Sequence, residues 1–189
     1  MKEKYKNQMK NVPNILSGFR LALIPAFAML FLTGQRELSG IMFMLAACTD
    51  ALDGYIARKY DAISKLGRIL DPVADKLMQF VALLCLAYAG AIPYWFAGIY
   101  MLKELVILCG GIKLFNAVAD VMPSKILGKI AAVMFYMSIT AIIFFKNMSL
   151  PIRYTLLTIC LTLTLAAMVD YILSYSKYLK TMKTIREKP

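Results

Sequence analysis

The chain has 189 residues, of which 60% are hydrophobic and only 17% are charged, and its formal net charge is +11. Soluble domains are closer to half apolar and about a quarter charged, so this composition excludes an ordinary soluble domain and indicates an integral membrane protein. The sequence contains no histidine, which excludes a Ser-His catalytic triad and a His-ligated metal.

The chain begins with a polar, basic stretch over residues 1–12, which predicts an amphipathic helix lying on the membrane surface. Six long apolar segments follow, and each is predicted to be a transmembrane helix because lipid requires backbone groups to be satisfied internally. These segments lie near residues 14–33, 38–60, 67–90, 92–116, 124–146 and 151–176. No linker or repeat separates them, so residues 1–189 are expected to form a single all-α membrane domain with six transmembrane helices.

Basic residues are concentrated in alternate connections between these segments. They are frequent before the first segment, between the second and third, around the start of the fifth and after the sixth, and sparse elsewhere. This alternation is typical of the positive-inside rule and predicts that both termini face the cytoplasm. A nucleic-acid partner is not expected, because the lysines are scattered over several connections.

Carboxylates occupy the second and third segments, where hydrocarbon makes a charge costly and a functional site is the default interpretation. Asp50 and Asp53 share one helix face, and Asp71 and Asp75 share a face of the next helix. A short basic connection would bring these helices together antiparallel. The four carboxylates would then repel one another unless a divalent cation joined them, and oxygen-only ligands favour Mg²⁺ or Mn²⁺.

Phosphate recognition is indicated by the residues that flank these carboxylates. Arg58 offers a planar guanidinium suited to phosphate oxygens. Gly54 and Ala57 are small enough to let a bulky group approach the helix. Carboxylates, a metal and an arginine at the end of a membrane bundle together favour a lipid-linked phosphate or diphosphate as substrate.

The pattern D-x2-D-G-x2-A-R-x8-G-x3-D-x3-D in this region resembles the signature of the CDP-alcohol phosphotransferases, also called CDP-alcohol phosphatidyltransferases. Every fixed position is met, by Asp50, Asp53, Gly54, Ala57, Arg58, Gly67, Asp71 and Asp75. The opening stretch 11–20 and the tripeptide 127–129 also look like the bacterial phosphatidylglycerolphosphate synthase branch of that family.

The resemblance implies a six-helix homodimer in the bacterial cytoplasmic membrane, with an active site that faces the cytoplasm. It implies two divalent ions held by Asp50, Asp53, Asp71 and Asp75. It implies that the CDP moiety lies against Asp50, Asp53, Gly54, Ala57, Arg58 and Gly67. It further implies that Asp75 is the general base, and that an acceptor hydroxyl attacks the lipid-bearing phosphorus of CDP-diacylglycerol while CMP leaves.

The acceptor is less constrained, because the sequence departs from the synthase branch in the fourth segment. That branch usually has an Arg-Glu pair there and a second arginine two turns later, whereas this chain has Lys103-Glu104 and then the region of Gly111. The candidates for binding an acceptor phosphate are Lys103, Lys125, Lys129 and Arg20. Glycerol 3-phosphate is the favoured acceptor, phosphatidylglycerol (the cardiolipin synthase reaction) is the alternative, and inositol phosphate and serine stay open.

Two other classes of protein account for these residues less well than an enzyme does. A small cation or proton transporter also carries acidic residues on facing helices, but it has no need of Arg58 or of small residues at 54 and 57. A purely structural membrane scaffold leaves the four carboxylates without an explanation.

Overall fold

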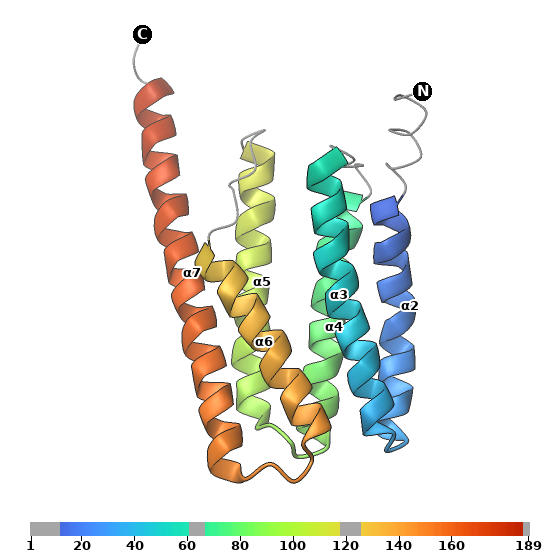
Figure 1. Ribbon diagram of the computed structural model, residues 1–189. Helices are drawn as coiled ribbons and strands as arrows, with labels where there is room; N and C mark the ends of the chain where they lie inside the picture. Colours follow the sequence, from blue (N-terminus) through green and yellow to red (C-terminus); the bar gives the residue numbers. More distant parts are fainter. Residues whose placement is uncertain (1–11, 61–66, 118–125, 187–189) are drawn as a thin grey trace, which may run out of the picture. The chain divides into compact units, whose positions relative to one another are not determined.

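The computed structural model describes residues 12–60, 67–117 and 126–186, and every regular element in that part of the chain is a helix (Figure 1). The helices are α2 (Val12–Leu32), α3 (Arg36–Tyr60), α4 (Gly67–Tyr88), α5 (Tyr94–Ala117), α6 (Ile126–Phe144) and α7 (Leu150–Arg186). They confirm the all-α prediction. The predicted surface helix over residues 1–12 lies outside the described residues, except that Val12 begins α2.

The helix boundaries agree with the predicted segments to within two residues, with the exception of the C-terminal end of α7. This segment was expected to end near residue 176, whereas the helix continues to Arg186. The apolar pattern marks where a segment leaves the hydrocarbon, and the backbone has no reason to stop there. Residues 177–186 contain neither proline nor glycine, so nothing in them terminates a helix.

Three helices in the described part of the chain are long and apolar enough to cross a membrane. The corresponding stretches are Ile15–Leu32, Ile126–Phe144 and Leu150–Leu173. They support a membrane protein. The remaining three predicted spans include α3 and α4, which carry the charged signature residues and are therefore less apolar.

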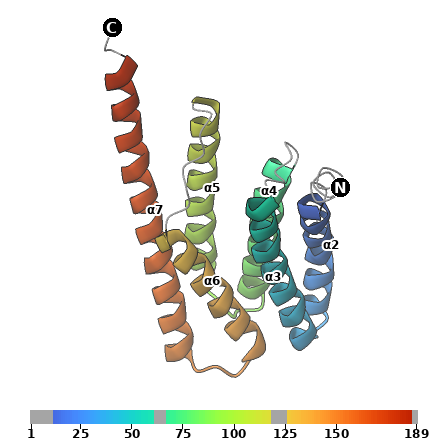
Figure 2. The same cartoon turned by 45° about the horizontal axis from the view of Figure 1, so that its top comes forward.

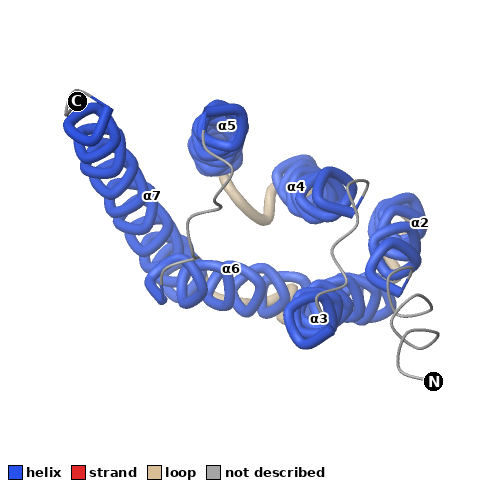
Figure 3. The backbone as a smooth tube through the Cα atoms, turned by 90° about the horizontal axis from the view of Figure 1, so that it is seen from above, coloured by secondary structure: helices blue, strands red, loops and turns tan. Residues whose placement is uncertain are grey.

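The chain divides into two compact units, and the signature belongs to the first. This unit consists of Met1–Ala97 and Ile139–Asn147, and the second consists of Gly98–Ser138 and Met148–Pro189. Within the first unit, α2 packs against both α3 and α4, as Figures 1 and 3 show. The start of α2, the end of α3 and the start of α4 lie at the same end of this unit (Figure 2).

Aromatic and aliphatic side chains fill the interior of the first unit away from the signature. The ring of Phe27 is fully buried, and its centroid lies 5.9 Å from that of Phe31 and 5.9 Å from that of Phe43 on α3. Gly34 makes the tight turn between α2 and α3, where its φ of 84° costs a glycine little. The short turn and the aromatic contacts therefore fix α2 against α3.

Candidate functional site

A buried arginine on α2 connects the two helices that carry the signature. The Nη1 atom of Arg20 lies 3.0 Å from Oδ1 of Asp50 on α3 and 3.1 Å from Oδ1 of Asp71 on α4. The Arg20 side chain is fully buried, whereas the side chains of Asp50 and Asp71 are 37% and 41% exposed. One guanidinium nitrogen thus brings carboxylates from two helices together, and both carboxylates stay partly exposed.

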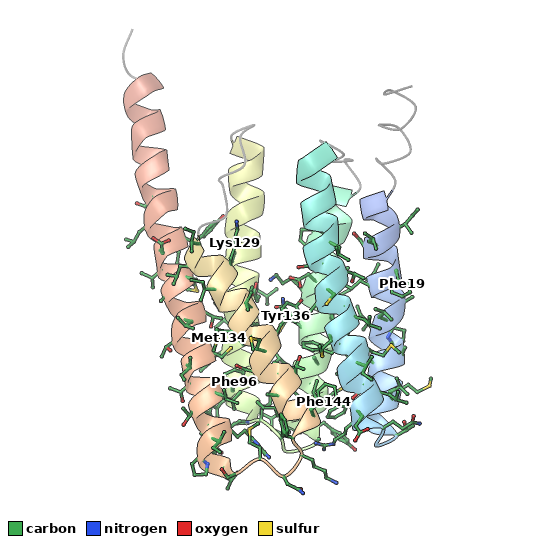
Figure 4. All side chains as sticks on the ribbon, in the orientation of Figure 1. Phe19, Phe96, Lys129, Met134, Tyr136 and Phe144 are labelled. Atoms are coloured by element: carbon green, nitrogen blue, oxygen red, sulfur yellow. The ribbon has the colours of Figure 1, made fainter. Side chains whose placement is uncertain are left out.

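Ser17 supports this arrangement from the preceding turn of α2. Its hydroxyl donates a hydrogen bond of 3.4 Å to Oδ1 of Asp71, and its side chain is buried. Residues three apart share a helix face, so Ser17 and Arg20 both point toward the carboxylates. Phe19 between them lies on the outer side of α2 and is half exposed (Figure 4). The inner face of α2 is therefore polar at the level of the signature and apolar further along, at Phe27.

Asp75 lies one turn after Asp71 on α4 and is held by two side chains of its own helix. The Gln79 amide nitrogen Nε2 donates to Oδ1 and Oδ2 of Asp75, at 3.0 Å from each. The Lys76 ammonium lies 3.1 Å from Oδ2. The Asp75 side chain is only 16% exposed and that of Gln79 is buried. Asp75 is thus more enclosed than Asp50 or Asp71.

The described carboxylates interact electrostatically. Asp50 is repelled by the charges of Asp75 and Asp71 and is attracted by those of Arg20 and Lys76. Like charges this near one another disfavour simultaneous ionisation, and a nearby cation offsets that cost. The three signature aspartates therefore form one acidic site that two basic side chains partly neutralise.

The other signature residues are placed by their backbone alone. Asp53, Gly54, Ala57 and Arg58 lie on α3, in the two turns that follow Asp50, and Gly67 begins α4. Their side chains are outside the described residues, as is the whole of Lys125. Among the described side chains, no three acidic, cysteine or histidine residues come close enough together to hold a metal ion, and Asp53 is not one of those searched.

The acceptor candidates Lys103 and Lys129 belong to the second unit and differ from each other in burial. Lys103 is buried on α5, where its ammonium pairs with Glu104 and lies 4.2 Å from the centre of the Tyr100 ring. Lys129 lies near the start of α6 and is exposed (Figure 4). The fourth acceptor candidate, Arg20, contacts the signature carboxylates as described above.

Sequence reasoning did not predict a role for Ser17, Lys76 or Gln79 at this site. Their helical spacing from Arg20 and Asp75, which were predicted as site residues, could have identified them. Ser17 precedes Arg20 by three residues, Lys76 adjoins Asp75, and Gln79 follows Asp75 by four. Gln79 is also the single polar amide in the uncharged stretch 77–102, where an amide needs a hydrogen-bonding partner.

Comparison with known proteins agrees with the signature. The sequence model of the family described as CDP-alcohol phosphatidyltransferase matches residues 10–172. A Bacillus subtilis protein named CDP-diacylglycerol–glycerol-3-phosphate 3-phosphatidyltransferase is 29% identical over 93% of this chain and 99% of its own length. A Rickettsia typhi protein of the same name is 45% identical over 37% of this chain and 41% of its own length.

A third relative carries a different name. This Mycobacterium tuberculosis protein, provisionally named as a cardiolipin synthase, is 33% identical over 67% of this chain and 61% of its own length. The family description and the names of the three relatives all belong to one group of lipid-synthesising transferases. The chain therefore belongs to the CDP-alcohol phosphatidyltransferase family.

Proposed function

We propose that the chain transfers the phosphatidyl group of CDP-diacylglycerol to a hydroxyl of glycerol 3-phosphate, giving phosphatidylglycerol phosphate and CMP. The observation that carries this proposal is the link that Arg20 makes between Asp50 and Asp71, because it brings signature carboxylates of two helices to one place. The name of the Bacillus subtilis relative, which is matched over 99% of its length, specifies the same two substrates.

The carboxylates fit the two divalent ions, Mg²⁺ or Mn²⁺, that the family resemblance implies. Carboxylate oxygens are the ligands that such hard cations prefer. Asp50 and Asp71 already lie on either side of one cationic nitrogen, so their spacing accommodates a positive charge. In the proposed site, the ligands are Asp50, Asp53, Asp71 and Asp75. Divalent ions there would neutralise the diphosphate and stabilise the leaving oxygen.

The CDP moiety is proposed to lie along the last turns of α3 and the start of α4. Gly54, Ala57 and Gly67 would let the nucleotide approach the backbone, and Arg58 would bind phosphate oxygens. The spacing of these positions along α3 supports this assignment, since they occupy successive turns of one helix. Asp50 and Asp53 would contact the same moiety through its diphosphate.

Asp75 is the proposed general base. The acceptor hydroxyl oxygen bonds to the phosphorus that carries diacylglycerol, and the bond from that phosphorus to the bridging oxygen of CDP breaks. The hydroxyl proton passes to the Asp75 carboxylate, and CMP leaves with the electron pair of the broken bond. With no histidine in the chain, a carboxylate is the plausible base, and the enclosed position of Asp75 supports this choice.

The proposed setting is the bacterial cytoplasmic membrane, with six membrane-spanning helices, a surface helix over residues 1–12 and a homodimeric assembly. Both termini and the site would face the cytoplasm and the inner-leaflet lipids. The distribution of basic residues supports this orientation. The apolar stretches of α2, α6 and α7 support a membrane location.

Phosphatidylglycerol is the alternative acceptor, and the product would then be cardiolipin. The relative from Mycobacterium tuberculosis favours this reading through its name. The region of Gly111 does so as well, because the synthase branch usually has a second arginine there, which the similar cardiolipin synthases lack. Family membership in turn argues against the transporter alternative, which has no use for a phosphate-binding signature.

A product assay separates these possibilities. Purified full-length protein is incubated with CDP-diacylglycerol and Mg²⁺, with glycerol 3-phosphate, phosphatidylglycerol, inositol phosphate or serine added singly. CMP release and the lipid products are followed by mass spectrometry. We expect phosphatidylglycerol phosphate from glycerol 3-phosphate only. Formation of cardiolipin from phosphatidylglycerol would show that phosphatidylglycerol, and not glycerol 3-phosphate, is the acceptor. Ion flux without any CMP release would contradict an enzymatic function.

A further inference from the structure

The side-chain amide of Gln79 donates to both oxygens of the Asp75 carboxylate. Its Nε2 atom lies 3.0 Å from Oδ1 and 3.0 Å from Oδ2. An atom equally distant from both oxygens lies between them, on the side of the carboxylate that coordinates a metal ion in a bidentate manner. This side is called the chelating edge. A hydrogen-bonded nitrogen and a metal ion cannot occupy that edge together.

We propose that Gln79 is a positioning residue that closes the chelating edge of Asp75. This inference rests on the proposed function, in which Asp75 serves both as a metal ligand and as the base. With the edge closed, Asp75 would hold a divalent ion through one oxygen at most, and it would keep more of its negative charge for the proton of the acceptor hydroxyl. A carboxylate gripped through both oxygens is a weaker base, because the ion withdraws charge from each.

The surroundings of Gln79 fix its amide in this place. The residue is 3% exposed, and its helical neighbours Met78, Ala82 and Leu83 are fully buried. It follows Asp75 by four residues, so the helix itself brings the two side chains together. Its Oε1 atom is buried and has no hydrogen-bond partner among the described residues, so no other contact there competes for the amide.

Lys76 complements this contact from another direction. Its ammonium lies 3.1 Å from Oδ2, so Asp75 is held by a neutral donor at the edge and by a cation on one oxygen. Two donors from one helix leave the carboxylate little freedom to rotate. The site thereby distinguishes Asp75 from Asp71, which is held from α2 and is more exposed.

A purely structural role for Gln79, satisfying a buried carboxylate, makes a different prediction. Loss of such a contact would weaken folding, metal binding and turnover together. Opening the chelating edge would instead let Asp75 grip an ion with both oxygens. Metal affinity would then rise while turnover falls, and opposite changes in the two measurements identify the positioning role.

The test compares Gln79→Met with wild-type protein, both full length and in detergent. Methionine keeps the length of the side chain and removes the donor. Mn²⁺ affinity is measured by electron paramagnetic resonance, and kcat and KM by CMP release. We expect kcat to fall by about tenfold or more, with Mn²⁺ bound more tightly than in wild type and the KM for CDP-diacylglycerol little changed. Unchanged Mn²⁺ affinity, or affinity that falls in parallel with kcat, would overturn the inference.

Leu86→Met is the matched control, since Leu86 is fully buried two turns beyond Gln79 on the same face of α4 and is not a neighbour of Asp75. It should leave Mn²⁺ affinity and kcat near wild type. Gln79→Asn is a second variant that shortens the amide and also opens the edge, in case Gln79→Met does not fold. If no acceptor supports CMP release by wild type, the proposed function fails, whereas the Mn²⁺ comparison still decides the role of Gln79.

Discussion

The guanidinium of Arg20 lies 3.0 Å from the Asp50 carboxylate, and the same nitrogen lies 3.1 Å from Asp71. Arg20 is fully buried, so this cation is desolvated and depends on its carboxylate partners. The contacts tie α3 and α4 to α2 at the level of the signature. The acidic site therefore has an internal counter-charge, built from a residue outside the signature itself.

Replacement of Arg20 by methionine should both destabilise the protein and stop turnover. Methionine fills much of the space but leaves Asp50 and Asp71 to repel each other. We expect the free energy of unfolding to fall by about 1.5–3 kcal/mol, the usual worth of hydrogen bonds to charged groups. A lower apparent melting temperature in detergent and the loss of CMP release would show this.

Arg20→Lys serves as the companion variant, because lysine keeps the charge but lacks the planar fork. It should recover part of the melting temperature. Ser39→Ala is the control for the loss of a buried polar group, because it removes a buried hydroxyl on α3 away from the signature. Wild-type stability and turnover in Arg20→Met would contradict the bridging role.

Asp71→Asn should remove turnover through the loss of a metal ligand. The amide is nearly the same size, and Arg20 keeps Asp50 as a charged partner, so the fold should be retained. We expect Mn²⁺ affinity to fall by about 10–100-fold, with a melting temperature lowered by less than in Arg20→Met, because only one of the two carboxylates loses its charge. The measurements are Mn²⁺ binding by electron paramagnetic resonance and CMP release. Wild-type activity in this variant, or in Asp50→Asn, would contradict the assignment of that aspartate as a metal ligand.

Asp75→Asn should separate chemistry from binding. An amide cannot take the acceptor proton, so kcat is expected to fall by about 100-fold or more, the usual effect of losing a general base. Some binding of CDP-diacylglycerol should remain, which equilibrium binding of a labelled analogue would measure. If binding and turnover decline in strict parallel, the assignment of Asp75 as the base loses its support.

Much of the fold could be predicted from the sequence, because a long apolar segment in lipid must satisfy its own backbone hydrogen bonds and therefore forms a helix. The start of α4 at Gly67 and the end of α3 at Tyr60 match the prediction to the residue. The end of α7 was missed because apolar periodicity carries no information about a helix that continues into water. Helices α3 and α4 are the least apolar of the predicted spans because they carry the site.

The candidate site was predictable in its carboxylates but not in their partners. The spacing of Asp71 and Asp75 along a helix places them on one face from sequence alone. That Arg20 contacts Asp50 and Asp71 depends on how α2 packs against two other helices, which is a tertiary property. Gln79 lay within reach of local reasoning, since an i, i+4 pair on α4 needs no tertiary information.

Lys129 and Lys103 offer a contrast between an exposed and a buried acceptor candidate. Lys129→Ala should raise the KM for the acceptor more than that for CDP-diacylglycerol and leave the melting temperature unchanged. Lys103→Ala should lower the melting temperature as well, because a buried ion pair with Glu104 would be broken. Steady-state kinetics with each substrate varied in turn provide the test. A larger KM effect for CDP-diacylglycerol would move Lys129 to the nucleotide side.

Gly40→Ala tests the packing of the first unit away from the site. A Cβ atom at Gly40 on α3 would lie 2.7 Å from Cε2 of Phe144 and 2.9 Å from its Cζ, which is closer than atoms approach without displacement. These atoms are the far end of the Phe144 ring, which is 36% exposed and can turn away, so the contact should cost less than the about 1–3 kcal/mol of overpacking in a buried core, against a gain of about 1 kcal/mol from the higher helix propensity of alanine. We therefore expect an apparent melting temperature close to that of wild type, with CMP release retained.

The variant Phe144→Leu distinguishes this clash from a general effect of substitution. Leucine is smaller than the ring and vacates the space that the new methyl group needs, so Gly40→Ala should be more favourable in the Phe144→Leu background than alone. Contacting residues show such coupling, whereas independent sites add. If the effects of the two substitutions on the melting temperature are additive, the close approach of α3 to Phe144 is not what constrains position 40.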